Sequence, residues 1–303
     1  MVNILKPITI EEEYVKNPDI SPEDIKKLRD WLKTQPHLPG DLLTDVDLMI
    51  VFHCCDKSQE VSKQVLDLHF TLKTMFQMFF KDRAFDKKAE FHLNTILPVP
   101  LPTSTLQGHR AAYVRLLDPE PKNFNFVESV RVILMLFEMW QYEEGTFPGF
   151  CIIIDMDQTC VGHLLRLEPA TLKKALYYLQ ECLLTKLCGV HFINAPYFMD
   201  KLISLLKPFI KKELIDLLFI HEIGSDSIYK ILPKEAFPKE EGGNYKDHIT
   251  LRDENIDRLR ANHVYLREEN KRRVNESLRK GKKPSSIEKE FGIQGSFKKL
   301  DID

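Results

Sequence analysis

Three histidines, His163, His191 and His221, are the residues of this chain best suited to metal chemistry. They fall at turn and strand positions, so a fold could bring them together as ligands. No acidic or cysteine partner stands at a metal-ligand spacing beside them, which favours ordinary hydrogen-bonded histidines. The six cysteines, at positions 54, 55, 151, 160, 182 and 188, include no CxxC pair, so they indicate reduced thiols in a cytosolic protein.

A second candidate for chemistry is the run from Ile152 to Thr159, where an apolar strand leads into a DxDxT pattern built on Asp155 and Asp157. This pattern resembles the first motif of the haloacid-dehalogenase phosphohydrolases. The resemblance implies that Asp155 is a nucleophile and Asp157 a general acid, beside a bound magnesium ion. No later apolar strand ends in paired acids for that metal, so a phosphohydrolase is an alternative rather than the main hypothesis.

Composition narrows the classes of function further. The sequence has no GxxxxGK, GxGxxG or GxSxG motif, so it offers no phosphate loop, dinucleotide fingerprint or hydrolase elbow. A net charge of −2 over 303 residues gives no reason to expect nucleic-acid binding. No apolar run reaches the roughly 18 to 20 residues of a spanning helix, so any membrane contact is expected to be peripheral.

The candidate residues are held by a strand, a helix and a second strand. Residues 150–155 and 189–194 are short, apolar and β-branched, which predicts strands, and residues 168–186 between them have helical periodicity. Such a unit makes a right-handed crossover, so the two strands should be parallel. Residues 111–117 predict a further strand, and residues 126–142 predict a helix that is apolar on two sides.

The rest of the chain is predicted to be mainly helical. Helix starts at Ser21, at Thr44 or Asp45, and at Ser58 make the first 80 residues a helical bundle. The helix from Ser58 is expected to bury Val61, Val65, Leu68, Leu72, Met75, Phe76 and Phe79. Further along, we expect an extended proline-rich linker at 97–103, an amphipathic helix at 196–218, a short strand at 217–221 and a short helix at 225–231. The highly charged residues 250–283 are expected to form a solvated helix against the domain surface, with a polybasic membrane contact as the alternative.

Alternation along the two strands places an apolar row on one face of the sheet. Phe150, Ile152 and Ile154 point to the same face as Val190 and Phe192. Three very apolar helices surround that face. They can form a filled core, and a hollow version of the same core would be a lipid pocket.

Nearly the whole chain resembles the CRAL-TRIO lipid-binding family. The resemblance is carried by the run from Gly149 to Asp155, by the run from Gly189 to Phe198, by Lys207-Pro208-Phe209, and by the segment from Leu232 to Asn244. The residues 275–279 and 291–300 are similar to the tails of an invertebrate branch called alpha-tocopherol-transfer-protein-like. The resemblance implies a non-enzymatic carrier that encloses one hydrophobic molecule, such as a tocopherol (vitamin E), a retinoid or a phospholipid, and exchanges it at membranes. No cofactor is expected.

The ligand is expected inside the layer between sheet and helices. The predicted contacts are Ile133, Leu136, Phe137, Phe150, Ile152, Ile154, Val161, Ala175, Tyr178, Leu179, Cys182, Leu183, Leu187, Val190, Phe192, Phe198, Leu202 and Leu205. An apolar wall discriminates little between similar apolar shapes, so these residues leave the identity of the lipid open.

The resemblance also implies a mobile lid from Pro196 to about Lys207, whose apolar face, with Tyr197 and Phe198, closes on the ligand. Lys186 matches one position of a phosphoinositide-binding basic set, while Cys188, Glu213 and Leu217 stand at other positions of that set. Lys207, Lys211 and Lys212 are predicted to supply the charge that meets an anionic membrane.

The predicted fold is therefore α/β, with an N-terminal helical bundle before a CRAL-TRIO domain that has a small, mainly parallel sheet, flanking helices and a mobile lid helix. The expected domains are residues 1–95, the helical domain, residues 96–249, the lipid-binding domain, and residues 250–303, a charged helix and tail. We expect a cytoplasmic monomer that associates transiently with membranes and binds no nucleic acid. An interaction scaffold with a filled core is the other alternative.

Overall fold

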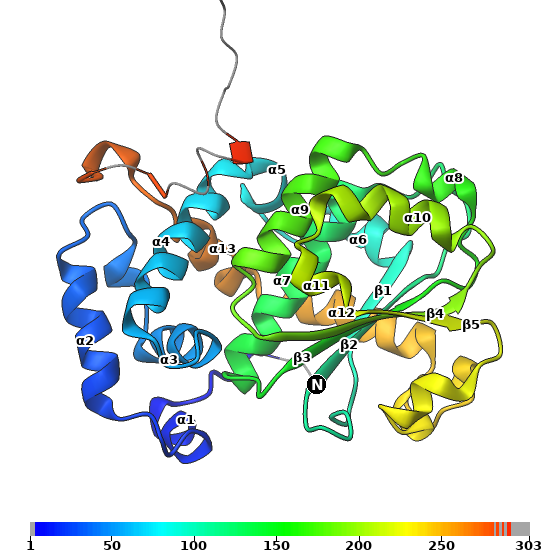
Figure 1. Cartoon of the computed structure of the whole chain (residues 1–303), viewed down its shortest axis with the longest axis horizontal. Helices are drawn as coiled ribbons and strands as arrows, with labels where there is room; N and C mark the ends of the chain where they lie inside the picture. Colours follow the sequence, from blue (N-terminus) through cyan, green and yellow to red (C-terminus); the bar gives the residue numbers. More distant parts are fainter. Residues whose placement is uncertain (1–3, 282, 285–286, 288–289, 292–303) are drawn as a thin grey trace, which may run out of the picture.

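One mixed sheet organises the molecule (Figure 1). The structure is a computed structural model that describes residues 4–281, 283–284, 287 and 290–291. In this part of the chain, five strands lie in the order β1-β2-β3-β4-β5. They are β1 (Ile96–Pro100), β2 (Arg110–Leu116), β3 (Phe150–Asp155), β4 (Leu187–Ala195) and β5 (Leu218–Glu222).

Strands β2 to β5 are parallel, as the strand-helix-strand unit predicts, and only β1 runs antiparallel to its neighbour. In the register of β3 and β4, Ile152 lies beside Val190 and Ile154 beside Phe192. These four side chains therefore share one face of the sheet. The predicted α/β class and the mainly parallel sheet are confirmed.

Strand β1 corrects the prediction of a proline-rich linker at 97–103. The segment is extended, but it pairs along its length with β2, with Pro98 opposite Val114 and Pro100 opposite Ala112. Proline has no amide hydrogen and is tolerated on an edge strand, where one side of the backbone needs no partner in the sheet. On the free edge, Asn255 Nδ2 donates a hydrogen bond to the Pro98 carbonyl oxygen at 2.8 Å.

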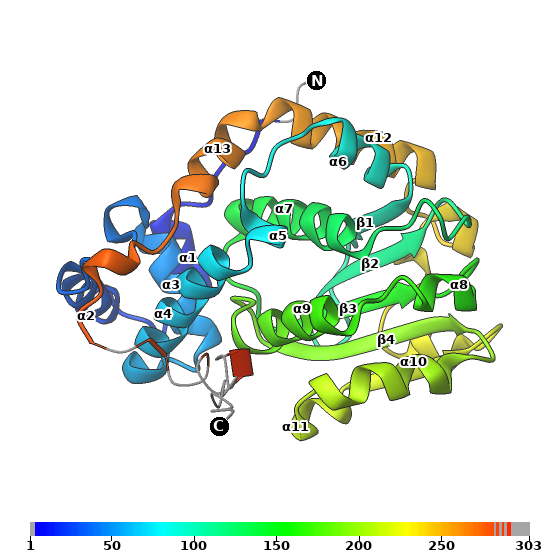
Figure 2. The ribbon, with the colours of Figure 1, turned by 90° about the horizontal axis from the view of Figure 1, so that it is seen from above.

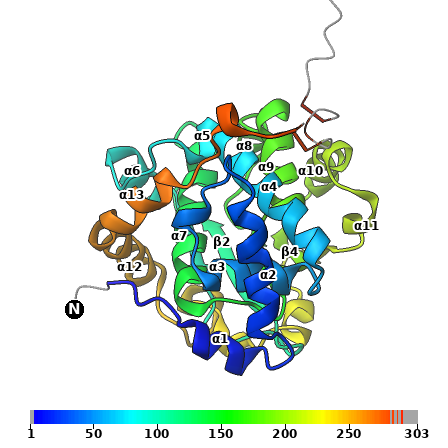
Figure 3. The same ribbon diagram turned by 90° about the vertical axis from the view of Figure 1, so that its left-hand side faces the viewer.

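Helices before the sheet begin at the caps that the sequence indicates. Ser21 and Thr44 each form a capping box, with Asp24 and Asp47 respectively. The helices are α1 (Ile10–Lys16), α2 (Pro22–Lys33), α3 (Asp45–Cys54), α4 (Gln59–Met75), α5 (Gln77–Phe80) and α6 (Lys87–Leu93), with a 3₁₀ turn at Gly40–Leu42. Figure 3 looks at the end of the molecule where α1 to α4 gather.

The predicted buried side of the third helix is partly wrong. Val61 and Met75 of α4 are exposed to solvent, and the helix ends at Met75. Phe76 and Phe79 pack instead from the following turn and α5. The helix buries a row that includes His69 and Lys73, because it lies between other helices and a buried ion-pair network rather than on one core.

The helices that follow β2 cover one face of the sheet (Figures 1 and 2). They are α7 (Phe126–Glu144), α8 (Val161–Leu164), α9 (Pro169–Glu181), α10 (Met199–Leu206) and α11 (Lys212–Ile215). Two of them are shorter than predicted. Helix α9 ends at Glu181 because the chain turns back there towards β4, and the amphipathic stretch 196–218 is divided around a 3₁₀ turn, Lys207–Phe209, where Pro208 cannot continue an α-helix.

The opposite face of the sheet is covered by 3₁₀ turns and by α12 (His248–Ala261). The turns are Asp226–Lys230, Lys234–Ala236 and Lys239–Glu241. Ile153 and Ile193 of the sheet pack here with Phe237 and Leu251. These side chains form an apolar core on this face of the sheet.

The C-terminal segment lies against the rest of the molecule, as expected, but it forms two helices and a turn with buried residues rather than one solvated helix. Helices α12 and α13 (His263–Lys271), with the turn Glu276–Leu278, run back along the molecule to the N-terminal helices, as Figure 2 shows. They bury Leu259 and Leu266, and Arg279 of the following segment pairs with Asp67 of α4 at 2.8 Å. Arg279, and Arg272 through its ion pair with Asp47, therefore hold this segment against the N-terminal helices. Residues 292–300 of the tail motif lie outside the described residues.

Candidate functional site

An apolar cavity of about 380 Å³ lies between the sheet and the helices α7, α9 and α10. This volume is within the range of small-molecule pockets in proteins. Ile152 and Ile154 of β3 are only half-buried although their strand is central in the sheet, because their side chains face this space. The strands β2, β4 and β5 supply Val114, Val190, Phe192 and Leu218 to the same floor.

Many residues predicted from the sequence as ligand contacts line this cavity. They are Ile133, Ile152, Ile154, Ala175, Tyr178, Leu179, Leu183, Leu187, Val190, Phe192 and Leu202. The structure thus brings together residues from α7, α9, α10 and the sheet. Their role in binding a ligand remains a prediction.

The other predicted contacts lie elsewhere. Phe137 and Phe150 pack with Trp140 and Phe147 in an aromatic cluster beside the cavity, with 5.2 Å between the ring centres of Phe137 and Phe150. Leu136 faces the opposite side of α7. Val161, Cys182, Phe198 and Leu205 pack against neighbouring side chains outside the lining.

Several lining residues were not predicted. Phe79 reaches the wall from α5, and Leu164 and Leu167 reach it from the segment around α8. The sequence spacing of these residues did not indicate that they line one cavity. Phe79, for example, reaches the cavity only through the packing of α5 against distant parts of the chain. Other lining residues outside the prediction are Ile96, Leu116, Phe124, Phe126, Val130, Leu134, Met156, Leu172, Leu176, Leu206, Ile210 and Leu214.

Few polar groups reach the cavity wall, and most of them are already bonded. Ser129 donates its hydroxyl hydrogen to the Asn125 carbonyl oxygen, and Thr159 donates to the Met156 carbonyl oxygen. The Gln180 amide donates to the carbonyl oxygens of Leu176 and Phe209. His163 also lines the cavity, and burial lowers the pKa of its imidazole.

Helix α10 occupies the segment predicted as a lid. Leu202 and Leu206 point to the cavity, and Ile210 and Leu214 extend the wall beyond the helix. The side chain of Tyr197 is 89 % exposed, so it does not contribute to the inward apolar face as predicted. Phe198 is buried beside the cavity rather than in its lining.

The predicted basic residues lie at the surface around this segment. Lys207, Lys211 and Lys212 are exposed, and Lys211 forms an ion pair with Glu181 of α9. Lys186 is exposed as well and pairs with Asp56 at 3.0 Å. The structure therefore groups three of the four lysines on one short stretch, and it sets Lys186 beside the N-terminal helices.

Asp155 of the DxDxT motif stands at the carboxyl end of β3, but its carboxylate is bonded within the fold. Its oxygens accept hydrogen bonds from Tyr113 Oη at 2.7 Å, from Asn194 Nδ2 at 2.8 Å and from the Asp157 backbone amide at 2.9 Å. Arg115 lies 3.5 Å from the same carboxylate. Burial and the neighbouring Asp155 raise the pKa of Tyr113, so the phenol stays protonated as the donor.

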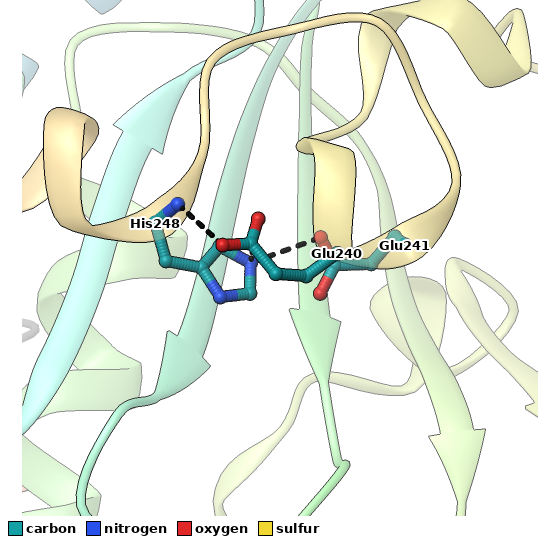
Figure 4. Close-up of side chains that lie close together, drawn as sticks. All are labelled: Glu240, Glu241 and His248. Carbon is teal, nitrogen blue, oxygen red and sulfur yellow. Dashed lines mark hydrogen bonds and ion pairs between the residues drawn. The ribbon is translucent and has the colours of Figure 1, made fainter.

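Arg115 also connects this motif to a polar cavity of about 440 Å³ on the other side of the sheet. There it pairs with Glu241, whose second oxygen lies 3.0 Å from His248 Nε2 (Figure 4). Ligand atoms of Glu240, Glu241 and His248 lie within 4.8 Å of one another. Because the Arg115 guanidinium already supplies positive charge to Glu241, the cluster is accounted for as an ion-pair network between the sheet and α12.

The histidines do not form the metal site considered from the sequence. His191 Nδ1 lies 3.1 Å from His221 Nε2, and His221 Nδ1 lies 2.6 Å from Ser227 Oγ. Burial and the neighbouring His221 lower the pKa of His191 to about 4, so the pair is neutral near pH 7. His163 lies on the opposite face of the sheet, at the apolar cavity.

In the described part of the chain, no helix is long and apolar enough to cross a bilayer.

Comparison with known proteins gives matches over most of the chain. The CRAL/TRIO domain matches residues 97–243, and the Pinta-like UBA domain matches residues 17–89. Clavesin-1 of Mus musculus is 29 % identical over 245 residues, which are 79 % of this chain and 69 % of that protein. Clavesin-2 of Homo sapiens is 26 % identical over 79 % of this chain and 75 % of its own length. The crystal structure of Sfh5 aligns with a TM-score of 0.45 at 13 % identity, over 77 % of this chain and 92 % of that chain.

Proposed function

Since this chain is a CRAL/TRIO domain protein, a class that binds and transfers lipids, we propose that it encloses one hydrophobic molecule in the apolar cavity and exchanges it at membranes. The observation that carries the proposal is the cavity itself. A space of about 380 Å³ between a sheet and three helices, with walls that are almost wholly apolar, is costly to leave empty. An apolar ligand would restore the missing contacts.

The proposed ligand is a tocopherol, a retinoid or a related lipid. The apolar wall draws residues from α5, α7, α9, α10 and the sheet, and its volume suits an extended chain or ring system. Its apolar character gives little discrimination among such molecules. We propose a non-enzymatic, monomeric carrier that works in the cytoplasm and needs no cofactor.

Exchange at a membrane is proposed to proceed through movement of α10. Its inner face, with Leu202 and Leu206, covers the ligand, and when the helix swings out this face needs a new apolar partner. The boundary of an anionic bilayer offers acyl chains and negative charge together. Lys207, Lys211 and Lys212 lie where they would meet that charge, and Lys186, beside the N-terminal helices, is proposed as a further contact to a phosphoinositide headgroup.

The test is organic extraction of the purified protein followed by mass spectrometry. A carrier should release one lipid species, or a narrow set, in an amount close to one molecule per chain. An interaction scaffold with a filled core would release only background lipid, in the same amount as an unrelated control protein from the same cells. That second result would overturn the proposal.

A further inference from the structure

One residue that lines the apolar cavity carries a buried polar atom with no hydrogen-bond partner. The atom is Nε2 of His163, a residue that is only 5 % exposed. Among the described residues, no other residue that lines this cavity has a buried side-chain atom without a partner. A buried donor or acceptor left unpaired costs free energy, so an unpaired atom on a residue that lines a cavity points to a partner in that cavity.

The contacts of Nδ1, the other ring nitrogen, determine whether Nε2 carries the proton. The backbone amide of Cys160 donates to His163 Nδ1 at 3.1 Å, and the Cys160 thiol lies 3.4 Å from the same atom. Nδ1 therefore accepts, and in a neutral imidazole the proton must be on Nε2. Burial lowers the pKa of His163, although the nearby Asp118 opposes this shift, and the neutral form is favoured. Nε2 is thus a hydrogen-bond donor.

The surroundings of His163 also favour an uncharged partner for Nε2. Phe124 packs against the imidazole with 5.7 Å between ring centres, so one flank of the ring is apolar. Arg115 is a cation on the wall, but it is paired with Asp155, Asp157 and Glu241. A carboxylate or phosphate in the cavity would find no free positive charge there, and burying an unpaired charge is much more costly than burying a neutral oxygen.

We propose that His163 Nε2–H donates a hydrogen bond to one neutral oxygen of the ligand, a carbonyl or hydroxyl oxygen at the α8 end of the cavity. This inference rests on the proposed function, and it narrows the ligand to an apolar molecule with a single uncharged acceptor near one end. It excludes pure hydrocarbons and fatty-acid anions as preferred ligands. His163 then acts as a specificity-determining residue in an otherwise undiscriminating wall.

Three probes of equal chain length test the proposal: hexadecan-2-one, hexadecane and hexadecanoate. Each displaces the apolar fluorophore N-phenyl-1-naphthylamine from the full chain, and its affinity is compared between the wild type and His163→Leu. Loss of one hydrogen bond should weaken the ketone about five- to tenfold and leave hexadecane within about twofold. His191→Leu is the matched control, because His191 is a buried histidine on the opposite face of the sheet, and it should leave all three affinities within about twofold.

A second measurement reads the donor directly. In protein labelled with ¹⁵N in its histidine rings, hexadecan-2-one should shift the Nε2 and Hε2 resonances of His163 downfield, and hexadecane should leave them nearly in place. If ketone and alkane bind and His163→Leu weakens both equally, or if the ketone leaves the His163 resonances unchanged, the role of His163 is wrong while the carrier function stands. If none of the probes displaces the fluorophore and extraction yields no lipid, the proposed function itself fails.

Discussion

Ile154 faces the apolar cavity from the centre of β3, so enlarging its side chain tests where the ligand lies. We expect Ile154→Trp to fill much of the space and to abolish lipid binding. The protein should remain folded, because the indole enters a cavity rather than a packed core, and overpacking costs only about 1–3 kcal/mol even in well-packed sites. The measurement is the lipid recovered by extraction, together with the free energy of unfolding in urea.

Leu183→Trp, from the turn after α9, should have the same effect, because Leu183 also lines the cavity. Tyr197→Trp is the control, because that side chain lies in solvent and the substitution adds a similar indole outside the cavity. Undiminished lipid content in a folded Ile154→Trp protein would move the ligand to another part of the molecule.

Asp155 and Asp157 have different tasks although they share one motif. Asp155 is buried and accepts three hydrogen bonds, from Tyr113, Asn194 and the Asp157 amide, whereas Asp157 is largely exposed and pairs only with Arg115. We expect Asp155→Asn to lower the free energy of unfolding by about 1–3 kcal/mol and Asp157→Asn to change it by less than about 0.5 kcal/mol. Urea titrations measure both values.

Lipid affinity of the folded fraction should be unchanged in either aspartate variant, because the ligand contacts proposed above do not include these carboxylates. Equal stability of the two variants would show that the hydrogen bonds of Asp155 carry no net stabilisation. A magnesium-dependent phosphatase activity that both variants lose would contradict the carrier and restore the phosphohydrolase alternative.

Strand alternation was enough to identify much of the cavity floor, because side chains in a strand alternate with a period of two residues. Ile152, Ile154, Val190 and Phe192 were assigned to the correct face on this basis. Phe150 lies on the same face, yet Trp140 and Phe147 fill the space in front of it. Periodicity gives the face of a side chain and cannot show whether that face is filled or hollow.

At the scale of the element, the stretch from α10 to α11 combines an apolar inner face with exposed lysines. Each lysine near an anionic membrane surface contributes roughly 1 kcal/mol, so changing Lys207, Lys211 and Lys212 to Gln should weaken attachment about a hundredfold. The ion pair of Lys211 with Glu181 is a local contact that a membrane would have to replace. We expect lipid transfer to anionic vesicles to slow strongly at low salt, while ligand affinity in solution stays unchanged.

The matched control for the lysine variant changes Lys26, Lys27 and Lys33 of α2 to Gln. These lysines are also exposed, and changing them removes the same amount of charge. They lie on α2, away from α10 (Figure 1). Transfer by the control should match the wild type. If both triple variants slow transfer to the same extent, net charge and not the position of the lysines governs the encounter with the membrane.

The existence of the elements was easier to predict than their ends. Capping boxes at Ser21 and Thr44 fixed two helix starts because they satisfy amide groups locally. The prolines of β1 predicted an extended segment, but they could not show that this segment pairs with β2. The ends of α4 and α9 were also set by tertiary packing, which a local pattern does not contain.

At the scale of the whole molecule, a buried ion-pair network joins three parts of the chain that are remote in sequence. Lys73 of α4 lies 3.1 Å from Glu138 of α7 and 3.1 Å from Glu269 of α13. Arg83, from the segment after α5, lies 2.6 Å from the other oxygen of Glu138. The network ties the N-terminal helices and the C-terminal segment to the helix that forms one wall of the cavity. No sequence pattern predicted it, because each partner is an ordinary charged residue until the fold brings the three segments together.

Glu138 makes this network sensitive to pH. Burial alone would raise the pKa of its carboxyl group, but the charges of Arg83 and Lys73 outweigh burial and lower it to about 2 in the folded protein. Because the folded pKa is below the unfolded value of about 4.5, the stabilisation from Glu138 is fully present above about pH 4.5 and is lost as the pH falls towards 2. We therefore expect Glu138→Gln to lower the free energy of unfolding by about 3–5 kcal/mol at pH 7, since it leaves the buried Arg83 without its carboxylate partner.

The difference in the free energy of unfolding between the wild type and Glu138→Gln should shrink between pH 4.5 and pH 2.5. In this range the stabilisation from the ionised Glu138 carboxylate is progressively lost. Urea unfolding over pH 2.5–7 measures this, with Glu60→Gln as the control, because Glu60 is exposed and pairs only with Lys63, so its removal should cost less than about 0.5 kcal/mol at any pH. A difference that stays constant down to pH 2.5 would mean that Glu138 does not titrate with the network. Since α7 also lines the cavity, Glu138→Gln should loosen that wall as well and weaken lipid retention at neutral pH, whereas Glu60→Gln should not.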